Sequence, residues 1–326
     1  MPHSLHVQVL HGLALATTFP LHQDRPAPPG TVPDVTVREG PPMAHTLETP
    51  GGRVLLDFGE NPDRWYTAVE RPDGSVLLRV YTVCDFVVSA DQGSVEMRMV
   101  EGTDPGMGAI LTCGTLVALL LQLRGSLVLH ASGVELGDTV IAFLGHSGMG
   151  KSTLAALMCT AGARVVTDDV LPILPGPVPT VLPGATELRL RPGAESLTAD
   201  LAAGTFRQRQ STDNRQVIGL EGARGTQLPL GAIVLPRPNR ENHLEMEVLE
   251  GKAALFAVLT FPRLMGWRDE SALARTFAQV STVVRTVPVF VAHVPWGPPF
   301  RSETVPMIRS AVLDRAAHLG AGSASR

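Results

Sequence analysis

Apolar and polar residues alternate in short runs over the first third of the chain. The runs are separated by turn residues such as Asp73-Gly74, and they span residues 5–15, 53–58, 65–70, 76–80, 86–89 and 95–100. A period of two is typical of half-buried strands, and an Asp-Gly pair favours a hairpin turn. The pattern predicts a small antiparallel sheet, interrupted at residues 20–42 by a proline-rich loop that cannot be helical.

The pattern changes after residue 104. The sequence EGTDPGMG at residues 101–108 predicts a boundary between a β-rich N-terminal domain at 1–104 and a second domain at 105–326. Because the first domain assembles no nucleophile, base or metal ligands, we expect it to serve substrate recognition or packing. The longest apolar run, at 110–123, is too short to cross a bilayer and predicts a buried helix.

Strand-like and helix-like patterns then follow one another through the second domain, which predicts an α/β fold. Prolines at positions 172, 175, 177, 179 and 183 indicate that the strands there are short or lie at sheet edges. Strands are predicted at 126–134, 139–144, from 163, 187–191, 231–235, 244–249 and 288–294. Helices are predicted at 152–161, 251–260, 271–284 and 303–319.

One segment of the second domain carries a recognisable chemical motif. Residues 145–152, GHSGMGKS, match the phosphate-loop pattern G-x-x-x-x-G-K-[ST], between a predicted strand and a predicted helix. Glycines let backbone N–H groups turn toward phosphate oxygens, and the start of a helix adds partial positive charge. We expect Lys151 to neutralise the β- and γ-phosphates and the Ser152 hydroxyl to coordinate Mg²⁺. The predicted nucleotide-binding residues are Gly145, Ser147, Gly148, Met149, Gly150, Lys151, Ser152 and Thr153.

The lysine content supports this interpretation. The chain has only two lysines, Lys151 and Lys252, and its other basic side chains, histidines aside, are arginines. A compact ammonium and a planar guanidinium are not interchangeable over a phosphate. A sequence that uses lysine so sparingly and places one in this motif indicates that the position requires it. The alternative is a glycine-rich turn without a ligand.

Composition and charge narrow the class of protein. The content of 44% hydrophobic and 18% charged residues is ordinary for a soluble protein with a core. A net charge of −4 with scattered basic residues gives no sign of a nucleic-acid or membrane partner. Cys84, Cys113 and Cys159 form no zinc-binding spacing and fit reduced thiols, and the N-terminal residues lack a signal-peptide pattern. The sequence therefore predicts a cytoplasmic protein.

A pair of carboxylates supplies the remaining chemistry. Asp168 and Asp169 end a predicted strand one strand–helix–strand unit after the glycine-rich segment, so a parallel sheet would place them near the phosphates. Phosphoryl transfer needs a metal, a positive cradle and a group that takes the acceptor's proton. One aspartate could therefore reach Mg²⁺ while the other faces an acceptor hydroxyl. The alternative is a solvated loop or a helix cap.

Together these segments resemble the C-terminal kinase domain of the HPr serine kinase/phosphorylase family. The resemblance rests on Leu129-His130, on GHSGMGKS and on VVTDD at 165–169, with a histidine before the loop and an Asp-Asp pair after it. The proline-rich loop and hairpins of the N-terminal part resemble HPr-kinase-related proteins encoded with peptide-tailoring enzymes, including lasso-peptide kinases. The resemblance implies a P-loop kinase core of the HPr kinase type beside the β-rich domain.

The resemblance also implies roles for single residues. Asp168 would be the general base, Asp169 would hold Mg²⁺ together with Ser152, and His130 would sit at the phosphate or the acceptor. From the residues alone, His130 is equally well a histidine of the core. The implied activity is transfer of the γ-phosphate of ATP, or of another nucleoside triphosphate, to a serine-type hydroxyl. The acceptor would be a peptide, a protein or an amino acid, and a homo-oligomer is possible by analogy.

The chain departs from that family at one signature. The family's Glu-x-Arg-Gly-x-Gly pattern is replaced by ELRLRPG at 187–193, which puts dephosphorylation and the HPr substrate in doubt and leaves Glu187 a weak candidate ligand. Arg207, Arg209 and Arg215 could include an arginine that stabilises transition-state charge or binds an acidic group. A solvated basic face is the alternative interpretation of this cluster.

Two other classes of function stay open. The chain could be a nucleotide-binding regulator, although it lacks the Asn-Lys-x-Asp motif of GTPases and the Ser-Gly-Gly signature of ABC ATPases. It could also be a scaffold that holds nucleotide without transfer activity. The complete set of Lys151, Ser152, Asp168 and Asp169 favours an enzyme, because inactive sites usually lose one of them.

Overall fold

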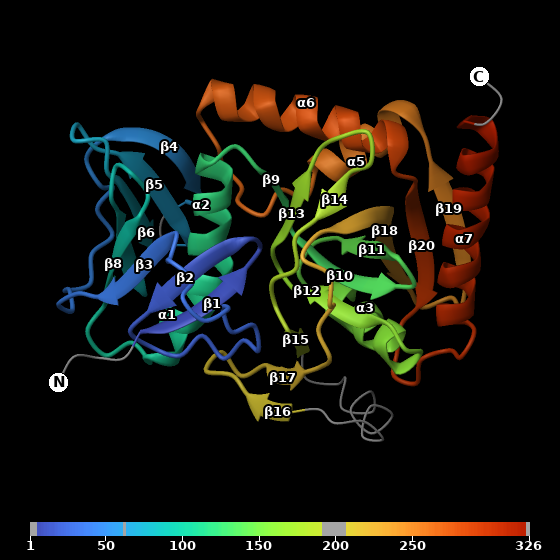
Figure 1. The fold of residues 1–326 in the computed structure, drawn as a ribbon, viewed down its shortest axis with the longest axis horizontal. Helices are drawn as coiled ribbons and strands as arrows, with labels where there is room; N and C mark the ends of the chain where they lie inside the picture. Colours follow the sequence, from blue (N-terminus) through green and yellow to red (C-terminus); the bar gives the residue numbers. More distant parts are fainter. Residues whose placement is uncertain (1–4, 61–62, 191–206, 324–326) are drawn as a thin grey trace. The chain divides into compact units, whose positions relative to one another are not determined.

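The computed structural model describes residues 5–60, 63–190 and 207–323 (Figure 1). The chain divides into two compact units, of which the first comprises Met1–Ser126 and Leu264–Thr276, and the second Leu127–Arg263 and Phe277–Arg326. Both units are built around large sheets, and the second combines its sheet with helices. The molecule is therefore a mixed α/β protein.

The first unit contains an eight-stranded sheet in the order β1-β2-β3-β8-β7-β6-β5-β4. Its strands are β1 (His6–Leu10), β2 (Leu13–Thr17), β3 (Val35–Glu39), β4 (Arg53–Phe58), β5 (Tyr66–Glu70), β6 (Val76–Val80), β7 (Cys84–Val88) and β8 (Ser94–Met99). Neighbouring strands from β8 to β4 are antiparallel, as predicted. β3 is parallel to both β2 and β8. β3 lies inside the predicted proline-rich loop, so that prediction was incomplete. Its sequence Val-Thr-Val-Arg-Glu alternates, but the prolines before and after it favour a loop.

A helical segment accompanies this sheet. It consists of α1 (Gly106–Leu111), a π-helical turn η1 (Thr112–Leu116) and α2 (Val117–Leu123). The segment Gly106–Leu123 has a mean hydropathy of 1.9, long and apolar enough by length and composition alone to cross a membrane. However, 67% of it is buried inside the protein, as expected for the predicted core helix. The length argument was wrong, because the helix begins four residues earlier than the apolar run at 110–123.

The predicted boundary after residue 104 differs from the observed division. The helical segment belongs to the first unit, where Gly108 lies against the Met97 side chain of β8 so closely that a Cβ would approach its Cε within 2.8 Å. Residues 264–276 return to the same unit, where Trp267 bridges to Leu56 and the Met265 N–H donates to the Tyr66 hydroxyl at 2.9 Å. Such long-range contacts leave no local signal in the sequence.

The second unit contains a nine-stranded mixed sheet. Its path runs β12-β10-β11-β18-β14-β13-β9, with β20 beside β18 and β19 beside β20. The strands are β9 (Leu127–Leu129), β10 (Ala131–Leu136), β11 (Thr139–Leu144), β12 (Arg164–Thr167), β13 (Leu171–Leu174), β14 (Thr180–Val181), β18 (Leu228–Asn239), β19 (Glu245–Leu249) and β20 (Val289–Pro295). The proline-bearing β13 and the neighbouring β14 are short, as predicted.

Strand direction in this sheet brings several loops to one edge. β11 is parallel to β18, and β18 is parallel to β20. β12 runs in the same direction as β11, because both are antiparallel to β10. The carboxyl ends of β11 and β12 therefore lie at the same edge of the sheet, where the glycine-rich loop and the two aspartates begin.

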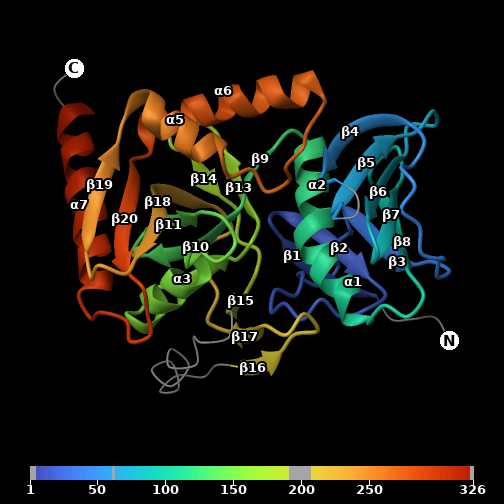
Figure 2. The same ribbon diagram turned by 180° about the vertical axis from the view of Figure 1, so that it is seen from behind.

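Helices cover both faces of the second unit's sheet (Figure 2). Helices α3 (Lys151–Thr160) and α7 (Thr304–Ser323) pack on one face, around Phe143, Val234 and Phe290. Helices α5 (Gly251–Leu259) and α6 (Glu270–Thr286), of which α6 crosses from one unit to the other, contribute to the core on the opposite face. All four lie at predicted helical positions. Neighbours on β18, such as Ile233 and Val234, alternate between the two cores, as a strand buried on both faces requires.

A three-stranded sheet adjoins α3. Its order is β15-β17-β16, and its strands are β15 (Glu187–Leu190), β16 (Arg207–Gln210) and β17 (Gln216–Gly219). Only β15 was predicted, because the arginines of β16 and of the turn before β17 resemble a solvated loop. Residues 191–193, the rest of the ELRLRPG stretch that replaces the family signature, lie outside the described residues.

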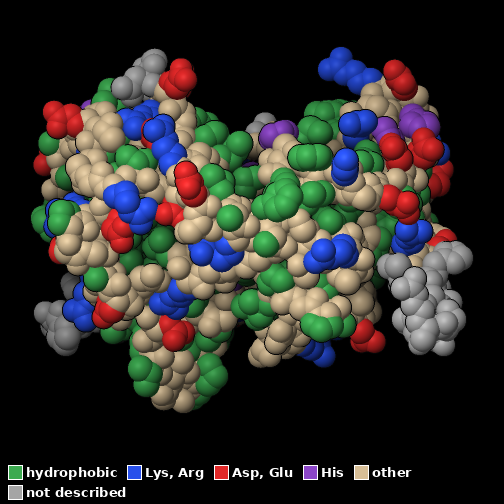
Figure 3. Space-filling view, turned by 90° about the horizontal axis from the view of Figure 1, so that it is seen from above, with side chains coloured by type: hydrophobic (Ala, Val, Ile, Leu, Met, Phe, Trp, Pro, Cys, Tyr) green, Lys and Arg blue, Asp and Glu red, His purple; other side chains and the backbone are tan. Residues whose placement is uncertain are grey.

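On the face seen from above, acidic and basic side chains are interspersed with apolar ones (Figure 3).

Candidate functional site

The glycine-rich loop at residues 145–150 joins β11 to the first residue of α3. Gly148 and Gly150 have φ values of 91° and 88°, a left-handed conformation that residues with a Cβ rarely adopt. No side chain caps the start of α3, so its first backbone N–H groups face the loop. The predicted residues Ser147, Met149 and Thr153 lie in this loop or in the first turn of α3. Backbone N–H groups at the start of a helix can bind an anion, so this loop is a candidate anion-binding site.

Lys151 lies folded back over the loop. Its Nζ donates to the carbonyl oxygens of Gly145 at 2.7 Å and His146 at 3.2 Å, and the residue is buried. Burial lowers the pKa of the ammonium, although the nearby carboxylates of Asp168 and Asp169 act in the opposite direction. The positive charge is therefore held at the mouth of the loop by backbone dipoles.

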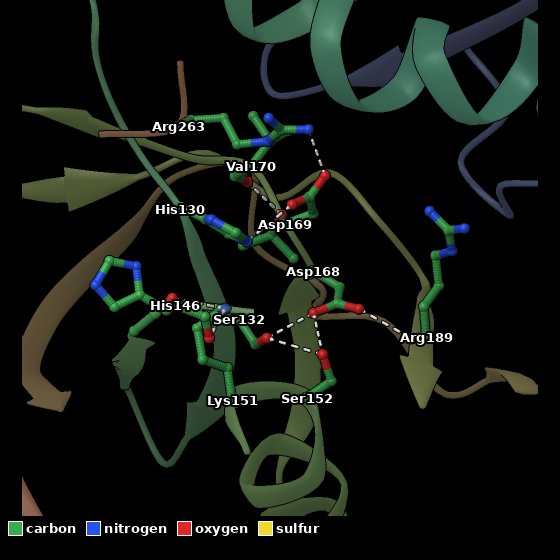
Figure 4. Close-up of polar contacts among 12 residues, drawn as sticks. His130, Ser132, His146, Lys151, Ser152, Asp168, Asp169, Val170, Arg189 and Arg263 are labelled. Carbon is green, nitrogen blue, oxygen red and sulfur yellow. Dashed lines mark hydrogen bonds and ion pairs between the residues drawn. The ribbon is translucent and has the colours of Figure 1, made fainter. Parts of the chain in front are cut away.

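Asp168 lies beside the first turn of α3 (Figure 4). Its Oδ1 accepts hydrogen bonds from the Ser152 hydroxyl at 2.9 Å and from the Ser132 hydroxyl at 2.5 Å. Its Oδ2 accepts from the backbone N–H of Arg189 at 2.9 Å. The carboxylate thus has three hydrogen-bond donors around it, none of which is a charged group.

The pKa of Asp168 is raised above its ordinary value. Burial is the largest cause, the neighbouring charge of Asp169 acts in the same direction, and the hydrogen bonds from Ser132, Arg189 and Ser152 oppose them. A carboxylate with a raised pKa holds a proton more readily than a solvated one. Asp168 is therefore suited to accept a proton from a hydroxyl.

Asp169 has the opposite environment. Its φ of 77° turns the chain at the end of β12, so that its side chain diverges from that of Asp168. Arg263 Nη2 lies 2.6 Å from Oδ2, and His130 Nε2 lies 3.2 Å from Oδ1. Burial would raise the pKa of Asp169, but the charge of Arg263 and the contacts of His130 lower it well below its ordinary value. Asp169 is therefore an anion held in place by contacts to Arg263 and His130.

The structure brings the predicted residues together but pairs them differently from expectation. Ser152 contacts Asp168, whereas the predicted shared metal site joined Ser152 to Asp169. The reason is the turn at Asp169, which directs the second carboxylate toward Arg263. His130, expected on one continuous strand, lies where that strand breaks into β9 and β10, and its backbone N–H donates to the Phe261 carbonyl at 2.9 Å.

The donor set fits Mg²⁺ in one respect. Ser152 and Asp168 offer two hard oxygen atoms beside the loop, and Mg²⁺ is commonly bound by one or two protein oxygens plus phosphates and waters. Among the described residues there is no group of three or more His, Cys, Asp or Glu side chains arranged to hold a metal. Glu187, the weak candidate ligand, is instead bound to Arg209 at 2.6 Å in the three-stranded sheet. Any ion here would therefore depend on nucleotide oxygens.

Three residues of the site were not expected from the sequence. Ser132 comes from β10, Arg189 from β15 and Arg263 from the segment after α5. Arg263 reaches the site because the neighbouring Pro262 bridges to Leu129 at the end of β9. Ser132 and Arg263 belong to no motif, although Ser132 lies two residues after His130. Arg189 is the arginine of the ELRLRPG stretch at 187–193, for which no role was predicted. Only the pairing of distant strands places them here.

Comparisons with known proteins give a distant structural similarity. No family model matches the sequence, and no curated protein matches it either. Among solved structures, the HPr(Ser) kinase/phosphatase from Coxiella burnetii is similar over 59% of this chain and 98% of its own length. The TM-score is 0.29 and the sequence identity 10%. This similarity is too distant to bear on activity, which has to be argued from the site itself.

Proposed function

We propose that this protein is a phosphotransferase that moves the γ-phosphate of ATP, or of another nucleoside triphosphate, to a serine-type hydroxyl. The observation that carries the proposal is the 2.9 Å contact between Ser152 and Asp168. It supports the proposal because it brings the Ser152 hydroxyl and the Asp168 carboxylate together beside the glycine-rich loop and Lys151. The raised pKa of Asp168 suits this carboxylate to take a proton from an acceptor hydroxyl.

The glycine-rich loop binds the triphosphate in this proposal. Backbone N–H groups of residues 145–150 and the start of α3 donate to phosphate oxygens. Lys151 leaves the carbonyl oxygens of Gly145 and His146 and binds the β- and γ-phosphates instead. Its burial supports this exchange, because a desolvated ammonium gains more from an anion than from neutral carbonyls.

Ser152 would hold Mg²⁺ by its hydroxyl, and the ion would supply charge stabilisation for the phosphates when bound. When the Ser152 hydroxyl turns from Asp168 toward the ion, Asp168 Oδ1 keeps fewer hydrogen-bond donors. Asp169 could bind the ion only by giving up its contacts to Arg263 and His130. We therefore assign Asp169 to the positioning of these two bases rather than to the ion.

Asp168 acts as the general base. The acceptor oxygen forms a bond to the γ-phosphorus while the bond from that phosphorus to the β,γ-bridging oxygen breaks, and the electron pair stays on the nucleoside diphosphate. The hydroxyl proton passes to Asp168 Oδ1. The Arg189 N–H keeps its hydrogen bond to Oδ2 and holds the carboxylate in place during the transfer.

The acceptor and the setting are proposed on the family resemblance seen in the sequence. A serine hydroxyl of a ribosomally made peptide, such as a lasso peptide, is the favoured acceptor, and the reaction would take place in the cytoplasm. A free amino acid or a protein offers the same hydroxyl chemistry. The chemistry of the site requires only an alcohol near Asp168, which a panel of acceptors can distinguish.

The two lysines of the chain provide a matched test of nucleotide binding. Lys151→Ala should weaken Mg²⁺–ATP binding roughly ten- to hundredfold, because a charge-assisted contact to phosphate contributes about 1.5–3 kcal/mol. Lys252→Ala removes the other lysine, which is exposed on α5, and should bind as the wild type does. Isothermal titration calorimetry gives both affinities, and circular dichroism checks the fold. Equal ATP affinity in the two variants would contradict the binding role of the loop.

A further inference from the structure

Asp213, at the tip of the hairpin between β16 and β17, forms ion pairs with two arginines. Arg189 Nη2 forms a close ion pair with Asp213 Oδ2, and Arg215 Nε lies 3.3 Å from the same oxygen. The hairpin is closed by hydrogen bonds between Ser211 and Arg215, in which the Ser211 N–H donates to the Arg215 carbonyl at 2.9 Å. One carboxylate therefore neutralises two guanidinium groups, which leaves one positive charge in excess.

The two arginines are not held equally. Arg189 is held at both ends. Its backbone N–H binds Asp168 and its side chain points away from that carboxylate (Figure 4). The guanidinium group pairs with Asp213. Arg215 has the longer contact, and its side chain is 37% exposed, against 21% for Arg189. Arg215 is therefore the partner that can leave Asp213 at the lower cost, because Arg189 remains to neutralise the carboxylate.

The backbone register places Arg215 one strand away from Asp168. Gln216 pairs with Leu190, and Arg215 immediately precedes Gln216 in the chain. Leu190 follows Arg189, whose N–H binds Asp168 on the opposite edge of β15, so one strand lies between the hairpin and that carboxylate, a separation that an arginine side chain can bridge. The charge of Arg215 also contributes to the lowered pKa of the Lys151 ammonium, as expected for two cations that border one site.

The balance of charge and of hydrogen bonds around the site calls for an anion. Around the site, four basic side chains lie near three carboxylates. Nε of Arg189 and Nε of Arg263 are buried without a hydrogen-bond partner in the described structure. A buried unpaired donor is costly, and a polyphosphate would supply the missing negative charge and an acceptor for Arg263. The cations are Lys151, Arg189, Arg215 and Arg263, and the carboxylates are Asp168, Asp169 and Asp213.

We propose that Arg215 leaves Asp213 when nucleotide binds and contacts the transferring phosphoryl group. This inference rests on the proposed function and adds to it a residue from outside the glycine-rich loop. A planar guanidinium can donate two hydrogen bonds to two phosphoryl oxygens at once, which suits the charge that spreads over these oxygens during transfer. Arg189 keeps Asp213 in place, so the hairpin tip retains its fold when Arg215 moves.

The test compares Arg215→Ala and Arg215→Lys with Arg207→Ala. Arg207 is exposed on β16 of the same small sheet and serves as the matched control. Arg215→Ala should lower kcat roughly a hundredfold, as the loss of one donor to transition-state charge does, with ADP affinity within about twofold. Arg215→Lys should recover only part of the rate, because an ammonium lacks the planar fork. Arg207→Ala should behave as the wild type.

A second readout does not depend on turnover. Mg²⁺–ADP with aluminium fluoride mimics the transferring group, and its affinity should fall in Arg215→Ala while that of Mg²⁺–ADP does not. Affinity for the mimic and kcat both within about twofold of wild type would overturn the inference. If the wild type transfers no phosphate, the proposed function fails. A selective loss of ATP over ADP affinity in Arg215→Ala would then still support contact with the terminal phosphate, and its absence would overturn that contact.

Discussion

Each unit of the protein holds a half-buried aspartate with several hydrogen bonds, and the two aspartates differ in what surrounds them. In the first unit, Asp57 accepts from Arg64 at 2.6 Å, from Thr67 at 2.7 Å and from Arg268 at 2.9 Å. In the second unit, Asp168 accepts only from two hydroxyls and one backbone N–H. Cations neutralise the first carboxylate, whereas none contacts the second directly.

This difference decides what each carboxylate can do. Burial would raise the pKa of Asp57, but Thr67, Arg64 and Arg268 lower it, so the group stays ionised and links β4 to residues 264–276. The pKa of Asp168 is raised, because burial and the charge of Asp169 outweigh the hydrogen bonds from Ser132, Arg189 and Ser152. Groups with shifted pKa values cluster at functional sites, so Asp168, beside the glycine-rich loop and without a direct cation partner, is the better candidate for chemistry.

The largest expected effect separates the two aspartates by activity. Asp168→Asn should lower phosphoryl transfer roughly 10²–10⁴-fold, because the amide cannot accept the acceptor's proton. ATP affinity should be retained, since the phosphates are bound by the loop and Lys151. Asp57→Asn should leave the transfer rate of the folded protein unchanged. Single-turnover transfer at saturating Mg²⁺–ATP measures the rates, and calorimetry measures the affinities.

The same pair of variants also gives the control. Both replace one carboxylate by an amide of nearly the same shape, so a general effect of charge loss would lower both rates alike. Turnover by Asp168→Asn at the wild-type rate would show that another group takes the proton.

A smaller effect should appear in the free energy of unfolding, where Asp57→Asn should be affected more than Asp168→Asn. Asp57→Asn should lower the free energy of unfolding by about 3 kcal/mol, because it leaves Arg64 and Arg268 without their anion. Asp168→Asn should be as stable as the wild type or more stable at neutral pH, because ionising the buried carboxylate costs free energy. Denaturant unfolding of both variants at neutral pH measures the difference.

The pH dependence follows from the direction of each pKa shift. The lowered pKa of Asp57 gives stability that is present above the unfolded pKa, about 3.9, and lost as pH falls toward the folded pKa. The raised pKa of Asp168 has the opposite sign, so its contribution falls as pH rises from the unfolded to the folded pKa. Asp168→Asn should remove that loss and Asp57→Asn the acid-side loss. Parallel unfolding curves for the two variants at acid and neutral pH would contradict these assignments.

Local patterns in the sequence predicted most of the elements that hold the site. The strand at 139–144 and the helix after it follow from a β-branched run and an Ala- and Leu-rich run, and the structure has both as β11 and α3. The hairpins of the first unit follow from alternation and turn residues. The strand β3 was missed because the prolines that flank it dominate the local signal.

The contacts that join distant segments could not be predicted in this way. Ser132 and Arg263 meet the two aspartates only because β10 lies between β11 and β12 and because residue 262 pairs with β9. The turn at Asp169, with its positive φ, was not visible either, and it changed the partner of Ser152 from Asp169 to Asp168. The motifs predicted only the residues of the glycine-rich loop and the two aspartates, whereas the chain direction at Asp169 set which aspartate contacts Ser152.

The most direct test of the account is transfer of phosphate by the wild-type protein. The protein is incubated with Mg²⁺–ATP and a panel of serine-containing peptides, proteins and free amino acids, and products are analysed by mass spectrometry. The account predicts one phosphoryl group added to a hydroxyl of at least one acceptor class, with ADP formed in equal amount, and loss of both in Asp168→Asn. ATP that is bound but neither transferred nor hydrolysed, in the wild type as in Asp168→Asn, would contradict it and leave a nucleotide-binding regulator or scaffold.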